Sequence, residues 1–385
     1  MMTDIEGRLK SALDERSSQQ SLRSLTAETA LVDFCSNDYL GFARSGVLKA
    51  RIREEEARHA HRRIGSTGSR LISGNSDYYE GLERHLAEFH RAESGLIFNS
   101  GYDANLGLFS SVPQRNDVIL YDQLVHASIR DGIRLSHAKA FPFRHNDVAD
   151  LIRRIEAQST EGETRTGNLF VAVESVYSMD GDFAPLKEMA GLCKHHGAGL
   201  IVDEAHATGV FGERGEGKVV ELGLQNDVFA RLHTFGKALG SHGAIVLGSQ
   251  TLRSYLVNFA RSFIYTTALP FHSLFSIRCA YELLAANDGT IPRLRERIRF
   301  FKDNIGRETS REMIPSDSAI QCVILPGNEN VKTAARKIQE AGFDVRPIMH
   351  PTVPEGSERL RICLHAFNTE DEIEGLITKL GVILK

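Results

Sequence analysis

One lysine in this sequence is surrounded by unusually small residues. Lys237 lies in the stretch L-H-T-F-G-K-A-L-G-S-H-G-A, with Gly236 directly before it and Gly240 three residues after it. A lysine on the protein surface has no need of such neighbours, whereas a lysine that bonds covalently to a bulky group does. The stretch therefore predicts a nucleophilic amine, and the two glycines are expected to leave room for the group that it holds.

An aspartate and a histidine follow a predicted strand upstream of this lysine. Gly199–Val202 is a short apolar run, Asp203 comes directly after it, and His206 follows three residues later. Because ligands bind at the carboxyl ends of the strands in open α/β sheets, Asp203 is expected to lie beside the ligand. A plain buried ion pair between Asp203 and Lys237 is the alternative, and these two residues alone leave it open.

The same residues match what pyridoxal phosphate (PLP) requires of a protein. A lysine forms a Schiff base with its aldehyde, and a carboxylate keeps its pyridine nitrogen protonated, so that the ring withdraws electrons. Thr234 offers a hydroxyl group for the phosphate. His126 follows the predicted strand Asp117–Tyr121 and is expected to stack on the pyridine ring, with a purely structural histidine as the alternative.

A seat for the phosphate is predicted where the segment N-S-G-Y-D-A-N-L follows the strand Gly95–Phe98 and opens a helix. Backbone amides at a helix start bind anions, and Ser100, Gly101 and Tyr102 stand at this one. These three residues are therefore expected to contact the phosphate or the edge of the ring.

Two motifs point to a different class of protein. V-D-E-A-H at Val202–His206 spells the DEAH box of helicases, and G-E-R-G-E-G-K at Gly212–Lys218 has the spacing of a phosphate-binding loop. Such a loop needs serine or threonine after its lysine to hold magnesium, but Val219 stands there. Glu213 and Glu216 would also put carboxylates where phosphates belong, and the two motifs are in the wrong order. An ATP-driven motor is therefore rejected, and the glycine-rich stretch is predicted to be a solvated turn.

Composition is that of an ordinary globular protein. A chain of 385 residues with net charge -4 suggests one large domain plus a smaller one, and its balanced charges do not suggest a nucleic-acid partner. No apolar run is long enough to span a bilayer, and the first ten residues lack the apolar core of a signal peptide. The five cysteines are scattered and form no C-x-x-C pair, which favours free thiols, no metal site and a cytoplasmic location.

The pattern of apolar runs predicts an α/β fold. Short apolar strands alternate with helices, and this is typical of a mostly parallel sheet covered on both faces. The predicted strands are Gly95–Phe98, Asp117–Tyr121, Leu169–Glu174, Gly199–Val202 and Gly243–Leu247, and the helices between them include Tyr78–His90 and Pro185–His196.

The two ends of the chain differ from this pattern. The N-terminal part predicts a polar amphipathic helix over residues 4–25 and a strand at Leu31–Cys35. The last hundred residues predict a small α+β domain, with helix Pro292–Ile305, strand Ala319–Leu325, helix Val331–Ala341, strand Leu360–Leu364 and a final helix from Thr369. We expect an N-terminal segment over 1–42, a large PLP-binding domain over 43–281 and a small C-terminal domain over 282–385.

Six motifs in order identify a family. They are S-N-D-Y-L-G, G-S-T-G-S-R-L-I-S-G, S-M-D-G-D, D-E-A-H-A-T-G-V-F-G, H-T-F-G-K-A-L-G and P-T-V-P-E-G-S-E-R-L-R-I. With them the chain resembles the α-oxoamine synthases, a fold-type-I family of PLP enzymes, from about residue 8 to the C-terminus. The resemblance implies a mostly parallel seven-stranded sheet in the large domain. It also implies a decarboxylative condensation of an amino acid with an acyl thioester, in a homodimer whose subunits share their active sites.

The resemblance assigns roles to the cofactor residues. Lys237 is the Schiff-base lysine, Asp203 pairs with the ring nitrogen, His206 contacts the ring hydroxyl, and His126 stacks on the ring and donates a proton. These four are the expected catalytic residues. The further cofactor contacts that the resemblance implies are Ser100, Gly101, Tyr102, Glu174, Ser178, Thr234 and, towards the phosphate of the partner subunit, Thr266 or Thr267. For Ser178, a residue that only forms a turn is the alternative.

Substrate contacts are implied on the same basis. Arg361 is expected to hold the carboxylate of the amino acid as a bidentate fork, with an ordinary salt bridge as the alternative. Asn37 and Thr352 are expected near the substrate, and Arg346–Pro351 beside the acyl channel. The segment before S-N-D-Y-L-G is about ten residues shorter than the family pattern, which leaves Arg23 as the candidate for the far carboxylate of the acyl chain.

The choice of substrate is the finest of these expectations. G-S-T-G-S-R-L-I-S-G and R-P-I-M-H-P-T-V-P-E-G favour the member of the family that serves biotin synthesis, which uses L-alanine and a pimeloyl thioester of CoA or acyl carrier protein. Another member, using glycine or serine and a different acyl thioester, is the alternative. A scaffold without turnover is disfavoured because it has no need to keep Lys237, Asp203, His126 and Arg361 together.

Overall fold

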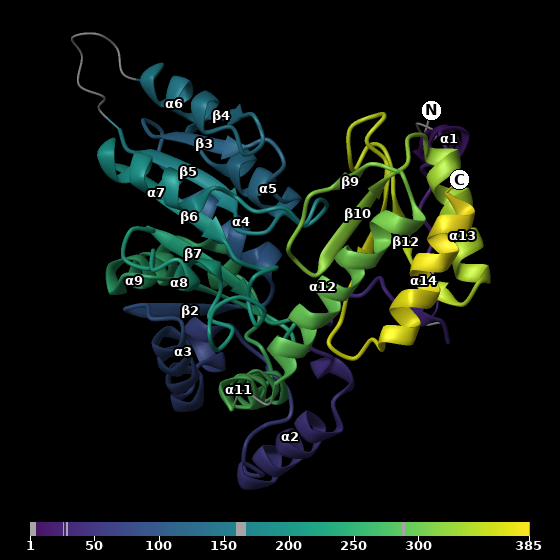
Figure 1. The fold of residues 1–385 in the computed structure, drawn as a ribbon. Helices are drawn as coiled ribbons and strands as arrows, with labels where there is room; N and C mark the ends of the chain where they lie inside the picture. Colours follow the sequence, from purple (N-terminus) through teal and green to yellow (C-terminus); the bar gives the residue numbers. More distant parts are fainter. Residues whose placement is uncertain (1–4, 26, 28–29, 159–166, 287–288, 385) are drawn as a thin grey trace. The chain divides into compact units, whose positions relative to one another are not determined.

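The computed structural model describes residues 5–25, 27, 30–158, 167–286 and 289–384 (Figure 1). Contacts between residues divide the chain into two compact units. The larger unit comprises residues 37–178 and 183–291, and the smaller one comprises residues 1–36, 179–182 and 292–385.

The larger unit is built on a seven-stranded sheet in the order β2-β8-β7-β6-β5-β3-β4 (Figure 1). Pairing within the sheet is parallel except on both sides of β8, so β8 alone runs against the other six strands. The strands are β2 Ser94–Phe98, β3 Val118–Asp122, β4 Lys139–Phe143, β5 Leu169–Glu174, β6 Ala198–Asp203, β7 Ala230–Thr234 and β8 Ala244–Gly248. The predicted α/β class with a mostly parallel seven-stranded sheet is confirmed.

Apolar residues that alternate along the strands build a core on each face of the sheet. In β6, Ile201 packs in a cluster with residues of α4 and α5, whereas Leu200 and Val202 pack in a second cluster with residues of α6 and α7. Each such buried side chain contributes about 1.5–3 kcal/mol to the free energy of unfolding. The helices of this unit are α2 Gly46–Arg58, α3 Asp77–Phe89, α4 Gly101–Ser111, α5 Ala127–Leu135, α6 Val148–Glu156, α7 Leu186–His195, α8 Lys218–Glu221, α9 Gln250–Phe259, α10 Arg261–Ile264 and α11 Phe271–Ala285.

The smaller unit contains an antiparallel four-stranded sheet in the order β12-β13-β10-β9 and a parallel pair, β1 with β11. Its strands are β1 Val32–Asp33, β9 Met313–Ile314, β10 Ile320–Ile324, β11 Phe343–Asp344, β12 Arg346–Ile348 and β13 Arg359–Cys363. Its helices are α1 Ile5–Ser18, α12 Thr290–Glu308, α13 Asn328–Glu340 and α14 Glu370–Ile383. The last helix begins with a capping box formed by Thr369 and Glu372, which satisfies two of its free backbone N–H groups.

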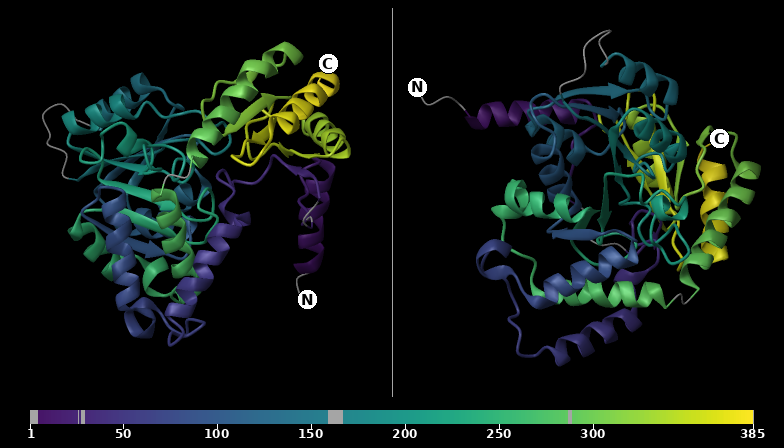
Figure 2. Two further views of the ribbon diagram at one scale, coloured as in Figure 1. Left: turned by 60° about the horizontal axis from the view of Figure 1, so that its bottom comes forward. Right: turned by 90° about the vertical axis from the view of Figure 1, so that its left-hand side faces the viewer.

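The predicted N-terminal elements are shorter in the structure. The helix expected over 4–25 starts at a residue outside the described ranges, and α1 ends at Ser18, just before Gln20 takes a positive φ of 55°. No side chain of α1 is buried, and Figure 2 shows the helix projecting from the rest of its unit. The strand expected at Leu31–Cys35 is reduced to the two residues of β1.

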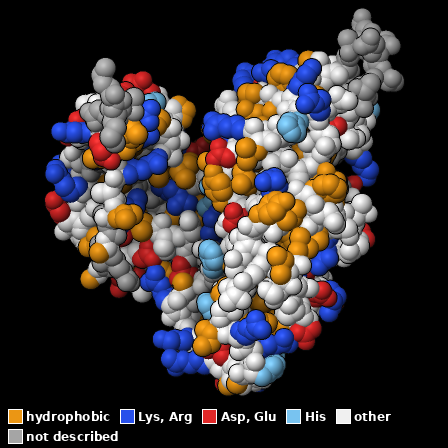
Figure 3. All heavy atoms as spheres, turned by 180° about the vertical axis from the view of Figure 1, so that it is seen from behind, with side chains coloured by type: hydrophobic (Ala, Val, Ile, Leu, Met, Phe, Trp, Pro, Cys, Tyr) orange, Lys and Arg blue, Asp and Glu red, His pale blue; other side chains and the backbone are white. Residues whose placement is uncertain are grey.

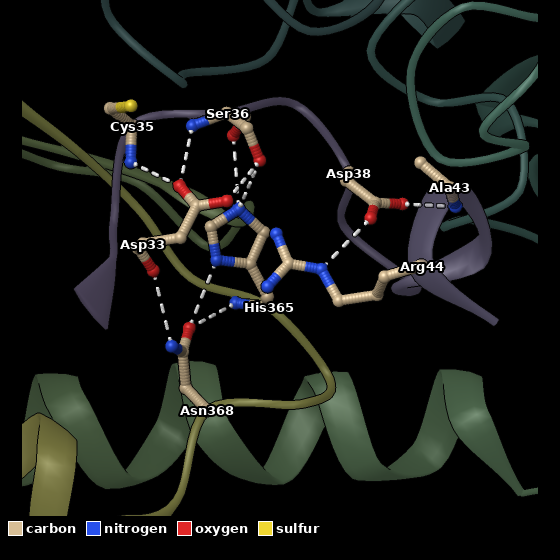
Figure 4. A network of polar contacts seen from close by, with 8 residues as sticks. All are labelled: Asp33, Cys35, Ser36, Asp38, Ala43, Arg44, His365 and Asn368. Carbon is tan, nitrogen blue, oxygen red and sulfur yellow. Dashed lines mark hydrogen bonds and ion pairs between the residues drawn. The ribbon is translucent and has the colours of Figure 1, made fainter. Parts of the chain in front are cut away.

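A hydrogen-bonded cluster fastens the segment after β1 to the C-terminal part of the smaller unit (Figure 4). The carboxylate of Asp33 accepts hydrogen bonds from the backbone N–H groups of Cys35 and Ser36, at 3.0 and 2.9 Å. His365 Nε2 lies 3.0 Å from the carbonyl oxygen of Ser36, and Asn368 Nδ2 donates to the carbonyl oxygen of Asp33 at 3.2 Å. These contacts hold residues 33–36 in the smaller unit.

The predicted solvated turn at Gly212–Gly217 is only partly correct. The stretch is a turn, with positive φ angles at Gly212, Gly215 and Gly217, but Glu216 is only 2% exposed. Glu216 Oε2 accepts a hydrogen bond from the backbone N–H of Arg214 at 2.8 Å. Glu213 and Arg214 of the turn are exposed as predicted, whereas the other residues of Gly212–Gly217 are buried and the Glu216 carboxylate organises the turn.

Surface charge agrees with the balanced composition. On the face of the molecule shown in Figure 3, basic and acidic side chains are interspersed on both units. Among the helices of the described ranges, none combines the length and the apolar character needed to cross a membrane.

Candidate active site

A cavity of about 280 Å³ lies in the larger unit and collects most of the predicted cofactor residues. Three of its polar residues, Glu174, Asp203 and Thr234, are the last residues of β5, β6 and β7. Because these strands are parallel neighbours, their carboxyl ends meet at one edge of the sheet, as predicted. The predicted residues that line the cavity are Asn37, Ser100, Gly101, Tyr102, His126, Glu174, Asp203, His206, Thr234 and Lys237.

Lys237 lies in the loop between β7 and β8, with its amine directed at a histidine. Its Nζ is 2.7 Å from Nε2 of His206. The other ring nitrogen of His206, Nδ1, is 2.7 Å from the hydroxyl oxygen of Tyr39. Tyr39 is 1% exposed and was not among the residues predicted from the sequence.

Only one of the two glycines that flank Lys237 leaves room in the cavity. Gly236 lines the cavity, and a Cβ added there would meet only the carbonyl oxygen of Ser241, at 3.5 Å. Gly240 has a positive φ of 58°, and an added Cβ would come within 2.2 Å of the backbone nitrogen of Ala43. The expectation for Gly240 was therefore wrong, because this glycine serves a turn and a close backbone approach instead.

The carboxylate of Asp203 is fixed by two donors. Oδ1 accepts a hydrogen bond from the backbone N–H of Ala205 at 2.9 Å, and Oδ2 accepts one from Nδ2 of Asn105 at 2.8 Å. The same Nδ2 lies 3.0 Å from Oγ of Ser128, which lies 2.7 Å from Nδ1 of His126. Asn105 and Ser128 therefore join Asp203 to His126, although neither was predicted.

Burial shifts the protonation of two groups in the cavity. It lowers the pKa of His126, with the charge of Lys237 acting in the same direction and Asp203 against it. Burial, followed by the negative charge of Asp203, raises the pKa of Glu174 to about 8, although backbone hydrogen bonds from His126 and Ser178 act against this shift. Near pH 7 His126 is therefore neutral and Glu174 is mostly protonated.

The start of α4 forms one wall of the cavity. The hydroxyl oxygen of Ser100 accepts a hydrogen bond from the backbone N–H of Asp103 at 3.0 Å and thereby caps the helix. A Cβ on Gly101 would lie 2.6 Å from Cγ2 of Thr234, so only glycine lets the helix start approach the end of β7 this closely. The hydroxyl group of Tyr102 is hydrogen-bonded to the carboxylate of Asp131.

Three predicted cofactor residues lie outside the lining of this cavity. Ser178 is buried and follows β5, where its backbone acts on Glu174. Nδ2 of Asn99 donates to Oγ1 of Thr266 at 2.9 Å and to the carbonyl oxygen of Thr267 at 2.8 Å. Both threonines are thus tied to the residue before the helix cap, and their contact with a partner subunit stays a prediction.

The predicted substrate residues Arg361, Arg23 and Thr352 belong to the smaller unit. Arg361 is 8% exposed on β13, where its Cα is paired in register with those of Cys322 and Arg346. Arg23 Nη2 donates to Oγ1 of Thr352 at 3.3 Å. The contacts of these three residues with a substrate stay predictions.

Comparisons with known proteins point to one family. The family model described as aminotransferase class I and II matches residues 29–380. An 8-amino-7-oxononanoate synthase from Emericella nidulans is 45% identical over 98% of this chain and 95% of its own. The aminoacyl transferase sphA of Byssochlamys spectabilis is 37% identical over 98% of this chain and 87% of its own.

A solved structure agrees with these sequence relatives. A lysine-to-alanine variant of serine palmitoyltransferase from S. paucimobilis, with a bound PLP–myriocin aldimine, has a TM-score of 0.88 and 25% identity, over 99% of this chain and 98% of its own. The predicted fold type is therefore confirmed. The chain belongs to the aminotransferase class I and II family and, within it, to the α-oxoamine synthases.

Proposed function

We propose that the chain condenses L-alanine with a pimeloyl thioester, with loss of CO2, to give 8-amino-7-oxononanoate and the free thiol of the carrier. The carrier is CoA or acyl carrier protein, and the product serves biotin biosynthesis. The observation that carries the proposal is the cavity in which Lys237 Nζ meets His206 at 2.7 Å beside a fixed Asp203 carboxylate. The 45% identity to an 8-amino-7-oxononanoate synthase supports this choice of substrates.

The polar groups of the residues around the cavity suit a polar ligand such as PLP. Glu174 and Asn105 line the cavity, and each has one buried side-chain oxygen, Oε1 and Oδ1 respectively, that has no hydrogen-bond partner among the described residues. Buried polar atoms of this kind are rarely left without one, so a polar ligand is expected there. When bound, PLP supplies an electron sink for negative charge at the α-carbon of the amino acid.

The residues of the larger unit divide into three groups around this cofactor. Lys237 would hold it covalently, and the start of α4 with Thr234 would hold its phosphate, because free backbone N–H groups at a helix start bind anions. The carboxylate of Asp203, fixed by Ala205 and Asn105, would keep the ring nitrogen protonated. His126 would stack on the ring as a neutral imidazole.

The chain's own groups then manage protons. Lys237 Nζ would take the α-proton of the amino acid, since an amine in a partly buried site acts as a base when it is neutral. His206, 2.7 Å away, would orient that amine. Glu174, mostly protonated near pH 7, would add no second full negative charge beside Asp203.

The remaining roles are proposed from the family resemblance. Arg361 would bind the carboxylate of L-alanine, with Asn37 and Thr352 near the substrate and Arg23 towards the far end of the acyl chain. Thr266 or Thr267 would reach the phosphate of the partner subunit in a homodimer. The domain over 43–281 would carry the cofactor and the domain over 282–385 the carboxylate contact. Five free cysteines support a cytoplasmic location.

A second candidate function has its own support. The likeness to sphA and to serine palmitoyltransferase favours an α-oxoamine synthase that uses glycine or serine with a different acyl thioester. Its chemistry at Lys237 and Asp203 would be the same. The two candidates differ only in the side chain of the amino acid and in the acyl chain.

A crossed substrate assay separates these candidates. The PLP-loaded protein is incubated with L-alanine, glycine or L-serine, each paired with pimeloyl-CoA, pimeloyl-acyl carrier protein, acetyl-CoA or palmitoyl-CoA. Release of thiol and CO2 is followed, and products are identified by mass spectrometry. We expect turnover with L-alanine and a pimeloyl thioester. Turnover only with glycine or serine would establish the second candidate, and no turnover with any pair would contradict both.

A further inference from the structure

Tyr39 does not line the cavity, but it contacts one of the histidines that do. Tyr39 is 1% exposed, and its hydroxyl oxygen lies 2.7 Å from Nδ1 of His206 and 3.1 Å from Oδ1 of Asn37. His206 in turn lies 2.7 Å from the amine of Lys237. Four side chains, Asn37, Tyr39, His206 and Lys237, therefore form one hydrogen-bonded row, and Asn37 and Lys237 both line the cavity.

The direction of the hydrogen bonds in this row follows from counting hydrogens. A tyrosine hydroxyl has a single hydrogen, and the side-chain oxygen of Asn37 can only accept, so the hydroxyl of Tyr39 donates to it. The hydroxyl oxygen must then accept from His206, which places a hydrogen on Nδ1. A neutral imidazole with its hydrogen on Nδ1 has a lone pair on Nε2, so Lys237 donates to it.

We propose that Tyr39 is a positioning residue that fixes the tautomer of His206 and thereby keeps the lone pair of Lys237 free for chemistry. An amine that donates a hydrogen to Nε2 retains its own lone pair for bonding to carbon or for taking a proton. With the opposite tautomer, Nε2–H would donate to that lone pair and block it. The inference rests on the proposed function only in taking Lys237 as the reactive amine.

The test compares two tyrosines that make the same kind of contact. Tyr39→Phe removes the hydroxyl group and keeps the ring. Tyr281→Phe is the matched control, because Tyr281 is fully buried in the same unit and its hydroxyl oxygen lies 2.8 Å from Nε2 of a different histidine, His90. Tyr281 does not line the cavity.

The first measurement needs neither cofactor nor substrate. Nitrogen-15 resonances of the imidazole rings are recorded in the PLP-free protein, and His206→Gln identifies the pair that belongs to His206. We expect a protonated Nδ1 and an unprotonated Nε2 in the parent protein. In Tyr39→Phe the two resonances should move towards each other, because both tautomers are then populated, while Tyr281→Phe leaves them in place. Unchanged His206 resonances in Tyr39→Phe would overturn the proposal.

The second measurement uses the loaded enzyme. Tyr39→Phe should lower kcat about tenfold, as expected for one lost hydrogen bond, with KM for the amino acid changed less than about twofold. Both variants lose one buried hydrogen bond, so Tyr39→Phe and Tyr281→Phe should lower the unfolding temperature by similar amounts. Only Tyr39→Phe should also lower kcat. Equal loss of kcat in both variants would reduce Tyr39 to a structural role. Because the resonances are read without substrates, a wrong substrate assignment would leave that result intact.

Discussion

Tyr39–His206 and Tyr281–His90 are hydrogen-bonded tyrosine–histidine pairs of the larger unit, and they differ in what the second ring nitrogen of the histidine contacts. In the pair Tyr39–His206 the second ring nitrogen faces the amine of Lys237 at 2.7 Å. In the pair Tyr281–His90 the second nitrogen, Nδ1, faces the backbone carbonyl oxygen of Glu216 at 2.7 Å. In the first pair the histidine therefore contacts the amine that we propose as the reactive group, and we call this pair open. In the second pair the two ring nitrogens of the histidine contact a tyrosine hydroxyl and a backbone carbonyl oxygen, and we call this pair closed.

Neighbouring residues along the chain separate the two surroundings. Asp203 and Thr234 line the cavity, whereas the adjacent Glu204 and His233 are fully buried outside its lining. His233 lies with its ring centroid 3.9 Å from that of His90. Burial lowers the pKa of His90 to about 3 and raises that of Glu204 to about 7. We call His90, His233, Glu204 and Tyr281 the closed cluster, and Asp203, His206, Lys237 and Tyr39 the open cluster. Perturbed pKa values alone do not mark an active site, because the pKa values of His90 and Glu204 in the closed cluster are strongly shifted although neither residue lines the cavity.

The largest expected effect comes from removing the amine of Lys237, which His206 contacts in the open pair. Lys237→Ala should lower kcat at least about 10⁴-fold, because the covalent contact and the base are lost together. Lys218→Ala is the control, since the amine of Lys218 pairs with Glu221 at 2.7 Å away from the cavity. Steady-state turnover of both variants checks this. A Lys237→Ala variant that retained a tenth of the parent activity would contradict the assignment.

The two adjacent carboxylates provide the next largest contrast. Asp203→Asn should lower kcat about 10²- to 10⁴-fold, because the carboxylate that keeps the ring protonated is lost. Glu204→Gln should leave kcat within about threefold, because Glu204 lies outside the cavity lining and its Oε1 accepts from the backbone N–H groups of Lys218 and Val219, as a glutamine oxygen can also do. Turnover rates measured at one pH check both. The distinction between the clusters would fail if both variants lost activity equally.

The smallest expected effect concerns the closed pair and the pH dependence of stability. The pKa of His90 is lowered to about 3 from 6.5, so its contribution to stability is present above pH 6.5 and is lost as the pH falls towards 3. His90→Gln should therefore lose less free energy of unfolding on acidification than the parent. The difference in slope should approach about 1.4 kcal/mol per pH unit below pH 6.

Urea unfolding at several pH values between 7 and 5 measures that slope. Tyr39→Phe serves as the reference variant, because it leaves His90 and its contacts in place. Its slope of unfolding free energy against pH should therefore keep the contribution of His90. Parallel curves for His90→Gln and the parent protein would show that His90 takes up protons in the folded state.

The residues of the open cluster could be predicted from the sequence better than those of the closed cluster. Asp203, Lys237 and His206 could be located because each follows the end of an apolar strand or lies in a motif with a chemical meaning. Asn105 carried no such signal, since a single asparagine inside a helix has no periodic pattern, and its contact with Asp203 exists only because α4 packs against the sheet. Tyr39 belongs to the motif S-N-D-Y-L-G, but nothing in that motif indicates a contact with a histidine 167 positions away.

Elementary strand geometry would have found part of the closed cluster. Successive side chains of a strand point to opposite faces, so His233 must face away from the ligand if Thr234 faces it. The fold itself was predicted to within one or two residues at most strand ends. Two strands of the seven-stranded sheet, β4 and β7, were not among the predicted ones. The residues of β4 are partly exposed and include Pro142, and the sequence of β7, A-R-L-H-T, interrupts its apolar residues with Arg231 and His233.

The smaller unit is assembled from both ends of the chain, and this affects how the protein is made. β1 pairs with β11, with Val32 opposite Phe343, so a strand that leaves the ribosome early waits about 300 residues for its partner. The contacts of Asp33 and Ser36 with His365 and Asn368 wait even longer. Until β11 has been synthesised, β1 lacks this partner strand, although residues 37–291 have already been made. The segment around β1 therefore cannot complete these contacts until residues 343–368 have been synthesised.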